Sequence, residues 1–368
     1  MRGHGEGSGQ ALRTPLRAFF NIPSRFIGGI LFTLVVFCFW PIPVFSHQAG
    51  DLYREAVAAI QNKEFHKAET TLQQAIQEFP SFPEAHHLLG MVQFHRTQNA
   101  ETAIPALQQA IQLNPHLAQA HYDLGLLFLK QEHMEKAQQS IQQALTIYPR
   151  FWEARLTLAK MYDQRGEIDK AIEEYQRVLT HQPLASEALY LLAYQFMQTH
   201  HSDEAQRLLL TLTEHDPHHT EGWFLLGRLA EQQNQPTEAI EAYQHVIHNN
   251  PEHIEAHYNL GFLYQQEDEP QKAIKHFQRV TELNPTDAEA FFNVGVLLVG
   301  ANQLEKAETA YKTGIELQPK SIEGQFNLGA FYEFHKKDLP QAKKHYQNYL
   351  QLGGADTRIQ QLLDKLQP

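Results

Sequence analysis

The chain has 368 residues, of which 42% are hydrophobic and 20% are charged, and its formal net charge is −12 at pH 7. Residues 1–46 hold four arginines against one glutamate, so the rest of the chain carries −15, which argues against a nucleic-acid partner. Cys38 is the only cysteine, and this excludes a disulfide framework or a cysteine metal site after residue 46.

The first 46 residues differ in kind from the rest. An arginine-bearing stretch ends at Arg25, the next fifteen residues, Phe26 to Trp40, are uncharged, and prolines at 41 and 43 precede Ser46. This order is typical of a signal peptide, and it predicts cleavage after Ser46. The alternative is an uncleaved N-terminal membrane anchor, because residues 26–45 reach the roughly 20 residues that span a bilayer. Either alternative puts the remaining chain across the membrane and limits membrane contact to this segment.

After this segment, prolines recur every 34 residues, with one interval of 35. They are Pro80, Pro115, Pro149, Pro183, Pro217, Pro251, Pro285 and Pro319. A period in the thirties indicates a repeat protein, in which each short unit is stable only against its neighbours.

Small residues recur in the same register. Twelve residues before each proline stands an alanine: Ala68, Ala103, Ala137, Ala171, Ala205, Ala239, Ala273 and Ala307. In most copies a second small residue stands twelve earlier: Ala56, Gly125, Ala159, Ala193, Gly227, Gly261 and Gly295. We expect each copy to form two antiparallel helices, A and B, whose backbones approach closely at these two positions. Proline then ends helix B.

A ninth copy runs from Gly329 to Ala342 without the closing proline. Beyond it, residues 357–368 place Ile359, Leu362, Leu363 and Leu366 on one face of a helix, with polar residues outside. This pattern predicts a C-terminal capping helix that covers the last repeat.

The segments Trp223 to Gly227, Tyr258 to Tyr264 and Lys272 to Phe277, followed by Leu283-Asn-Pro285, resemble the tetratricopeptide-repeat (TPR) family. The resemblance implies an all-α fold: a right-handed superhelical solenoid of nine TPR helix pairs over residues 49–356, plus the capping helix. It also implies that the A helices form a concave wall that binds a segment of another protein.

Three rows of residues recur on the expected A helices. Glutamate occupies the second position of the repeat in Glu84, Glu153, Glu187, Glu221, Glu255, Glu289 and Glu323. The fifth position is mostly aromatic, and the sixth is asparagine in Asn259, Asn293 and Asn327. Carboxylates and amides in such rows can pair with an extended peptide. The alternative is that all three rows are default residues of the family and carry no selection for a ligand.

Departures from the family pattern are more informative. The ninth and twelfth positions, usually polar in the family, form an apolar stripe: Met91, Phe94, Leu126, Leu129, Tyr194, Met197, Phe262, Val296 and Val299. Residues three apart share a helix face, and a large exposed apolar surface is usually a binding surface. The alternative is that superhelical curvature or an oligomer contact buries the stripe. We therefore predict partner binding at Leu126, Leu129, Tyr194, Met197, Phe262, Val296 and Val299, together with the three asparagines.

The family's clamp for a chaperone's C-terminal carboxylate is absent, since Glu, aromatic, Asn or apolar residues replace its basic side chains. An acidic, aromatic groove should instead prefer a basic and apolar segment. The 22 histidines include His253 and His257 at i, i+4, but no carboxylate or cysteine completes a metal site. We predict no metal, no cofactor and no catalytic residue.

These features predict a non-enzymatic interaction scaffold, exported to a bacterial periplasm, either soluble after cleavage near Ser46 or anchored by residues 26–45. The alternative function is a self-associating structural or assembly protein of the cell envelope, in which the stripe joins copies into a homo-oligomer.

Overall fold

The computed structural model describes residues 47–365, and every regular element in that range is helical. These residues fall into two compact units, which meet in the sequence between His181 and Gln182. The predicted leader therefore lies outside the described residues, as do residues 366–368 of the predicted cap.

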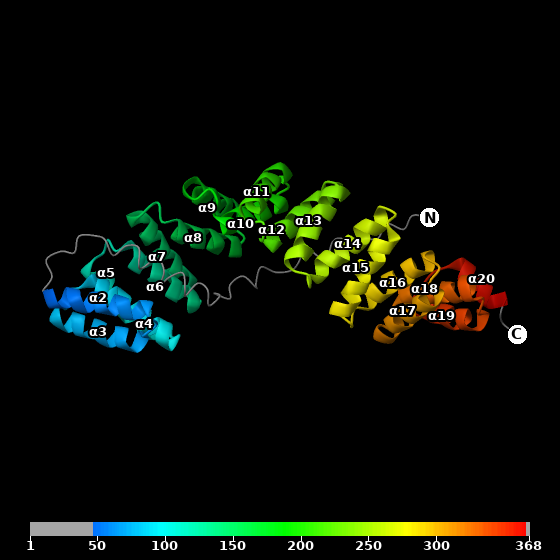
Figure 1. The fold of residues 1–368 in the computed structure, drawn as a ribbon, viewed down its shortest axis with the longest axis horizontal. Helices are drawn as coiled ribbons and strands as arrows, with labels where there is room; N and C mark the ends of the chain where they lie inside the picture. Colours follow the sequence, from blue (N-terminus) through cyan, green and yellow to red (C-terminus); the bar gives the residue numbers. More distant parts are fainter. Residues whose placement is uncertain (1–46, 366–368) are drawn as a thin grey trace. The chain divides into compact units, whose positions relative to one another are not determined.

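The first unit contains four helix pairs (Figure 1). They are α2 (His47–Gln61) with α3 (Phe65–Glu78), α4 (Pro83–Thr97) with α5 (Ala100–Leu113), α6 (Ala118–Lys130) with α7 (Met134–Ile147), and α8 (Trp152–Gln164) with α9 (Ile168–His181).

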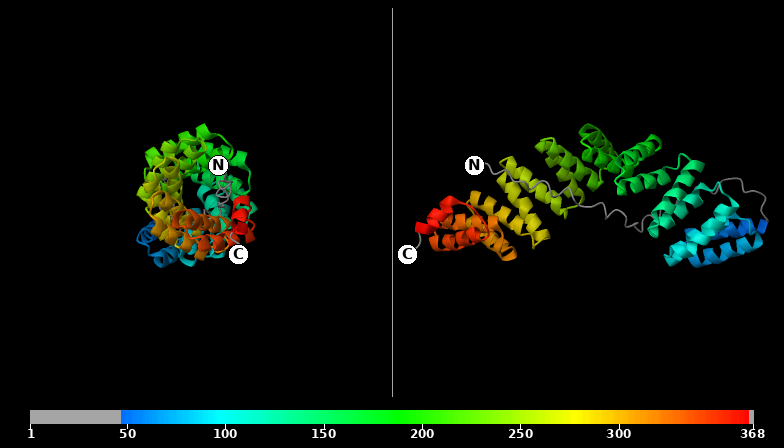
Figure 2. Two further views of the ribbon diagram at one scale, coloured as in Figure 1. Left: turned by 90° about the vertical axis from the view of Figure 1, so that its right-hand side faces the viewer. Right: turned by 180° about the vertical axis from the view of Figure 1, so that it is seen from behind.

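The second unit contains five pairs and a final helix, coloured from green to red in Figure 2. They are α10 (Ser186–Gln198) with α11 (Ser202–His215), α12 (Thr220–Gln232) with α13 (Pro236–Asn249), α14 (Ile254–Gln266) with α15 (Pro270–Leu283), α16 (Ala288–Gly300) with α17 (Leu304–Leu317), and α18 (Ile322–Phe331) with α19 (Leu339–Gln351), followed by α20 (Thr357–Lys365). The nine pairs and the added helix confirm the predicted all-α repeat fold.

The A and B helices of a pair approach closely at the predicted small residues. A Cβ atom added at Gly125 would lie 3.2 Å from the carbonyl oxygen of Ala137 and 2.7 Å from Ile141. In later copies the obstacle is the aromatic ring four residues after the alanine: a Cβ at Gly261 would lie 2.7 Å from the ring of Phe277. Glycine is therefore required in these copies because an aromatic side chain fills the seam.

One residue in each turn between A and B helices adopts a left-handed conformation, with φ between 55° and 71°. These residues are Lys63, Gln98, Glu132, Gly166, His200, Asn234, Asp268, Asn302 and Lys337. Eight of the nine are not glycine, although a side chain makes this conformation unfavourable by about 1–2 kcal/mol. The repeat geometry thus outweighs the local preference at each turn.

Most turns between repeats also contain the same side-chain hydrogen bond. In six of them the carbonyl oxygen of the proline accepts a hydrogen bond from the side chain six residues later, at the start of the next A helix. The donors are His86, His121, Arg155, Trp223, His257 and Gln325, at 2.8–3.1 Å. Their chemistry differs, but each supplies an N–H group to a carbonyl that helix B leaves unpaired.

Three of these donors also contact their own B helix. Arg155 donates to Glu174 at 2.5 Å, and the amide oxygen of Gln325 lies 2.8 Å from Nδ1 of His345. The third contact joins His257 to His276. Each chain of bonds ties an inter-repeat turn to both helices of the following repeat.

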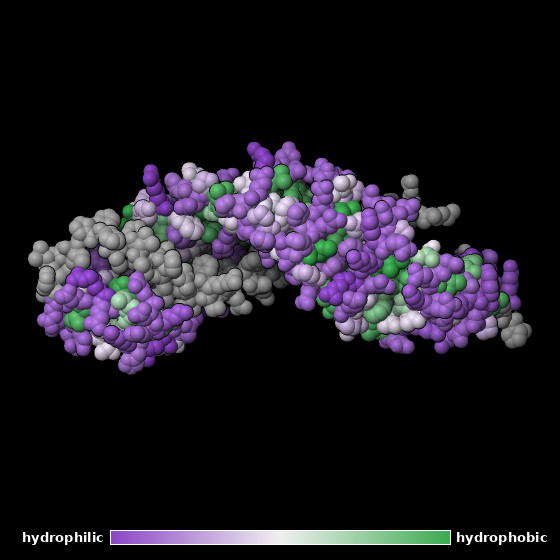
Figure 3. Space-filling view, viewed as in Figure 1, coloured by the Kyte–Doolittle hydropathy of each residue, from purple (hydrophilic) through white to green (hydrophobic). Residues whose placement is uncertain are grey.

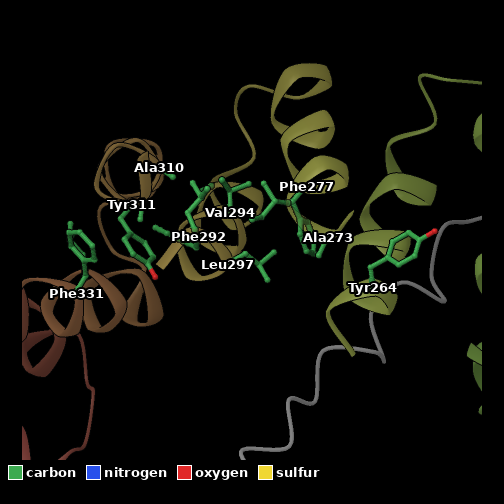
Figure 4. Packing of buried hydrophobic residues seen from close by; sticks show 14 of the residues in the cluster. Tyr264, Ala273, Phe277, Phe292, Val294, Leu297, Ala310, Tyr311 and Phe331 are labelled. Atoms are coloured by element: carbon green, nitrogen blue, oxygen red, sulfur yellow. The ribbon is translucent and has the colours of Figure 1, made fainter. Parts of the chain in front are cut away.

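Aromatic side chains fill the space between successive repeats of the second unit (Figure 4). Phe292 is 5% exposed, and its ring takes the space in which the next repeat has glycine instead of a larger residue. A Cβ at Gly324 would lie 2.3 Å from this ring. On the outside, hydrophilic residues cover most of the surface in view (Figure 3).

In the ninth copy Gly329 and Ala342 are thirteen residues apart instead of twelve, and a π-helical turn, η3 (Tyr332–Lys336), follows α18. The α20 cap then buries Ile359 and Leu363, as the apolar pattern predicted. Arg358 fixes the cap by an ion pair with Glu333 at 2.9 Å.

Candidate functional site

The candidate site is the set of A-helix positions that the repeat leaves available, taken separately in each unit. In the second unit these positions lie on α10, α12, α14, α16 and α18, which follow one another along the repeat. The structure allows the three predicted rows and the apolar stripe to be compared with the burial of each side chain.

Three members of the apolar stripe are buried. Met91 and Phe94 are each 8% exposed, and Met197 is 6% exposed, so these three side chains belong to the core. Leu126 and Leu129 are half-buried against the core of the first unit. The repeat itself therefore covers Met91, Phe94 and Met197.

The stripe becomes accessible in the later repeats. Val296 is 41% exposed, while Tyr194, Phe262 and Val299 are half-buried. Phe262 packs against Tyr258, with 5.2 Å between ring centroids. The apolar surface that the structure leaves open to a partner is centred on Val296 in α16.

The asparagine row has a structural use that the sequence did not reveal. Asn293 donates from Nδ2 to the hydroxyl of Tyr258 at 3.3 Å, which links the sixth position of α16 to the fifth position of α14. Asn259 interacts with the hydroxyl of Tyr243. Asn327 is half-buried and makes no side-chain hydrogen bond within residues 47–365.

The same link between a fifth and a sixth position occurs in the first unit. His87 lies on α4, and its Nε2 is 2.7 Å from the carboxylate of Asp123 on α6; the two side chains are 5% and 0% exposed. Tyr122 lies 3.2 Å from the hydroxyl of Thr157 on α8. These pairs hold successive A helices in register.

The buried hydroxyl groups of the second unit are strongly perturbed. Burial raises the pKa of Tyr258 and of Tyr243, and Tyr243 donates to a carboxylate oxygen of Glu231 at 2.5 Å. Burial, together with the charge of Glu221, raises the pKa of Tyr190 to about 12. These hydroxyl groups therefore stay protonated at neutral pH: Tyr190 and Tyr258 lie on A helices, and Tyr243 lies on the B helix α13.

The glutamate row differs between the units. In the second unit all five members are exposed: Glu187, Glu221, Glu255, Glu289 and Glu323. In the first unit Glu84 and Glu153 are half-buried. Burial raises the pKa of Glu153, and one carboxylate oxygen of Glu84 is buried without a hydrogen-bond partner. The open, negatively charged row thus belongs to the second unit.

The histidines that suggested a metal pair have other partners. Nδ1 of His253 accepts from the backbone N–H of Ala256 and caps α14, while Nε2 of His257 faces the carbonyl oxygen of Pro251. Residues 47–365 contain no group of three or more His, Cys, Asp or Glu side chains that could hold a metal ion.

Profiles described as tetratricopeptide repeat match residues 52–81, 128–193, 190–254, 254–287 and 288–321, and one described as TPR repeat matches residues 93–132. Together they cover more than half of the chain. The chain belongs to the tetratricopeptide-repeat family. The resemblance proposed from the sequence is confirmed.

Solved TPR structures match as well. The C-terminal part of a TPR repeat-containing protein from Cytophaga hutchinsonii is 15% identical, covers 66% of this chain and 99% of its own, and gives a TM-score of 0.56. At this identity the likeness shows the fold alone. MamA (26% identity, 45% of this chain and 91% of its own, TM-score 0.43) and YrrB, described as a TPR protein with an unusual peptide-binding site (22%, 50% and 95%, TM-score 0.45), also match.

The comparison with curated proteins found no match. Among the helices of residues 47–365, none combines the length and the apolar character needed to cross a membrane.

Proposed function

We propose that this TPR protein is a non-enzymatic scaffold, exported across a membrane, that binds a segment of a partner protein along the A helices of its second unit. The observation that carries the proposal is the exposed Val296 on α16, which shares its helix with half-buried Val299 and exposed Glu289 and its position in the repeat with half-buried Phe262 of α14. An apolar anchor beside a negatively charged row suits a partner with apolar and basic side chains.

Exposure limits which of the predicted residues take part. Val296, Phe262, Val299 and Tyr194 can contact a partner, and Asn259, Asn293 and Asn327 retain unused hydrogen-bonding capacity, since an amide has two N–H groups and an oxygen. Leu126 and Leu129 are also half-buried and remain predicted contacts. Met197 remains one as well, but it is 6% exposed, so a partner would reach it only at its edge.

The test is site-specific photocrosslinking of the full chain in its native cell. A benzoylphenylalanine residue is placed at Val296 on α16 or at Leu210 on the B helix α11, because the two side chains are equally accessible, at 41% and 42% exposure. We expect a heterologous adduct from position 296 and none from position 210. Equal yields from both positions, or no adduct from 296, would contradict the proposal.

The same experiment separates the alternative function. An adduct at position 296 with the mass of two copies of this chain would support a self-associating envelope protein instead of a partner-binding scaffold. Export is tested independently: protease added to spheroplasts should digest the repeats, whereas it should leave them intact if the chain stays inside.

A further inference from the structure

Arg228 interrupts the apolar stripe of the second unit. It occupies the ninth position of α12, the position of Tyr194 on α10, Phe262 on α14 and Val296 on α16. Its side chain is half-buried, and within residues 47–365 it forms no ion pair, no hydrogen bond and no ring contact. A positive charge thus sits unpaired in the middle of the predicted binding surface.

Groups from three helices lie close to this charge. The guanidinium opposes the rise in pKa that burial imposes on Tyr190 of α10, Glu231 of α12 and Tyr243 of α13. The carboxylate of Glu231 does not neutralise Arg228 directly. It accepts a hydrogen bond from Tyr243 at 2.5 Å and lies beyond the 4.0 Å range of an ion pair with Arg228.

In the first unit the ninth position of α8 also holds a cation, Lys160. Arg228 has no ion-pair or hydrogen-bond partner within residues 47–365, although a guanidinium presents five N–H donors in a fixed fork that matches a carboxylate. A half-buried arginine with unused donors gains most from a planar anion that binds through two parallel hydrogen bonds.

We propose that Arg228 pairs with the side-chain carboxylate of one aspartate or glutamate in the partner segment, whose other contacts are apolar and basic. This inference rests on the proposed function, because the segment lies along the same A helices. The carboxylate belongs to a side chain and not to a chain end: α10 precedes α12, and α14, α16 and α18 follow it within the unit (Figure 1), so the segment continues on both sides of Arg228.

Spacing defines the probe. Neighbouring helices pack about 8–10 Å apart, and an extended chain advances about 3.3 Å per residue, so roughly every third residue of the segment faces a new A helix. The probe is therefore a set of acetylated and amidated peptides of about 12 residues, long enough to pass four A helices at that spacing. Every third residue is Leu, Lys or Glu in all combinations, and the positions between are Ser. Blocked ends remove the terminal carboxylate.

The experiment measures binding of these peptides to the full chain by fluorescence anisotropy. We expect the tightest peptides to contain Glu at one register position among Leu and Lys. Changing that Glu to Gln, or Arg228→Gln in the protein, should weaken binding about 10-fold to 100-fold, and the two changes together should cost little more than either alone. Arg228→Glu should recover binding when the peptide residue becomes Lys.

The matched control is Arg207→Gln, which removes an exposed arginine of α11 and should leave every peptide affinity unchanged. Circular dichroism confirms that each variant is folded. The recovery of binding by Arg228→Glu with the Lys peptide is a second measurement, which does not rest on the loss of affinity in Arg228→Gln. If the tightest peptides lack Glu, or if Arg228→Gln binds them as wild type does, the inference is wrong while the proposed function stands. If no peptide binds wild type, the proposed function fails.

Discussion

The Nδ1 atoms of His257 and His276 lie 3.0 Å apart, and Pro251 determines the direction of the hydrogen bond between them. Nε2 of His257 lies 3.1 Å from the proline carbonyl oxygen, which can only accept, so this nitrogen carries the proton. Nδ1 of His257 is then an acceptor in the neutral ring, and Nδ1 of His276 donates to it. This bond requires His257 to be neutral, because Nδ1 of a protonated His257 could not accept.

Acid should therefore destabilise the second unit. Burial lowers the pKa of His257, and burial together with the charge of His257 lowers the pKa of His276 to about 4. The unfolded chain binds these protons near pH 6.5 and the folded chain only at lower pH, so the free energy of unfolding falls as the pH drops from about 6.5 towards 4. Thermal unfolding at about pH 7.5 and about pH 5, on either side of the unfolded pKa, measures this loss.

The variant that isolates the pair is His276→Gln, whose amide can still donate to His257. We expect it to reduce, without abolishing, the difference in melting temperature between the two pH values, because the pKa of His345 is also lowered to about 4 by burial. His248→Gln removes an exposed histidine of α13 and serves as the control. An unchanged difference in His276→Gln would count against the role of the pair.

The hydrogen bonds of the turn between repeats can be tested by giving one turn the side chain that another turn uses. In the ninth copy Gln325 performs both tasks of His257: it donates to Pro319 at 2.9 Å and its oxygen faces His345. We expect His257→Gln to change the free energy of unfolding by less than about 0.5 kcal/mol, whereas His257→Leu should cost about 1–3 kcal/mol, because it leaves two polar groups without partners. Urea titration measures the free energy of unfolding of both variants. An equal loss in His257→Gln and His257→Leu would contradict the idea that His257 and Gln325 make equivalent hydrogen bonds.

The fold could be predicted almost entirely from the sequence, because the repeat imposes one register on every copy. The prolines and small residues located the helix pairs, and Ile359 and Leu363 located the cap. Two features could not be predicted. The left-handed residue in each turn is seldom glycine, so composition gave no signal at Lys63 or His200. The π-helical turn of the ninth copy has no sequence signal either, because the second copy has the same thirteen-residue spacing, from Gly90 to Ala103, without such a turn.

The site was harder to predict, because burial depends on neighbouring repeats. Position within a repeat predicted one surface, but it could not distinguish the core residue Met197 from the exposed Val296. The pairing of Asn293 with Tyr258 joins residues 35 apart and has no local signature. Arg228 carries no signal in the sequence, because the apolar pattern of the ninth position does not include it. Arg228 has no hydrogen-bond or ion-pair partner within residues 47–365, and only the side-chain contacts of the structure show this absence.

The left-handed turns provide a stability prediction. His200 has φ 60° and Gly166 has φ 71° in equivalent turns. We expect His200→Gly to raise the free energy of unfolding by about 1 kcal/mol, since it removes the unfavourable contact of Cβ, and Gly166→Ala to lower it by a similar amount. Asn234→Gly is the control and should gain less, because asparagine tolerates this conformation. Denaturant midpoints compare the stability of the three variants. A lower midpoint in His200→Gly than in wild type would contradict the idea that the left-handed side chain is unfavourable.

Two glycines of neighbouring helices should respond in opposite ways to the same substitution. Gly300 ends α16 with no atom within 4 Å of an added Cβ, so Gly300→Ala should stabilise the protein by about 0.5–1 kcal/mol through helix propensity. Gly324 lies in α18, where an added Cβ would come within 2.3 Å of the Phe292 ring. Gly324→Ala should therefore cost about 1–3 kcal/mol, although most other copies have alanine at this position.

The double variant Gly324→Ala with Phe292→Leu shows whether the ring is the cause. A smaller side chain at position 292 frees the space, so the added methyl group should cost less in this background than in wild type, a coupling of about 1 kcal/mol or more. Calorimetric melting of wild type, the two single variants and the double variant completes the cycle. If Gly324→Ala costs the same in wild type and in the Phe292→Leu background, overpacking against the ring is not the reason that this copy uses glycine.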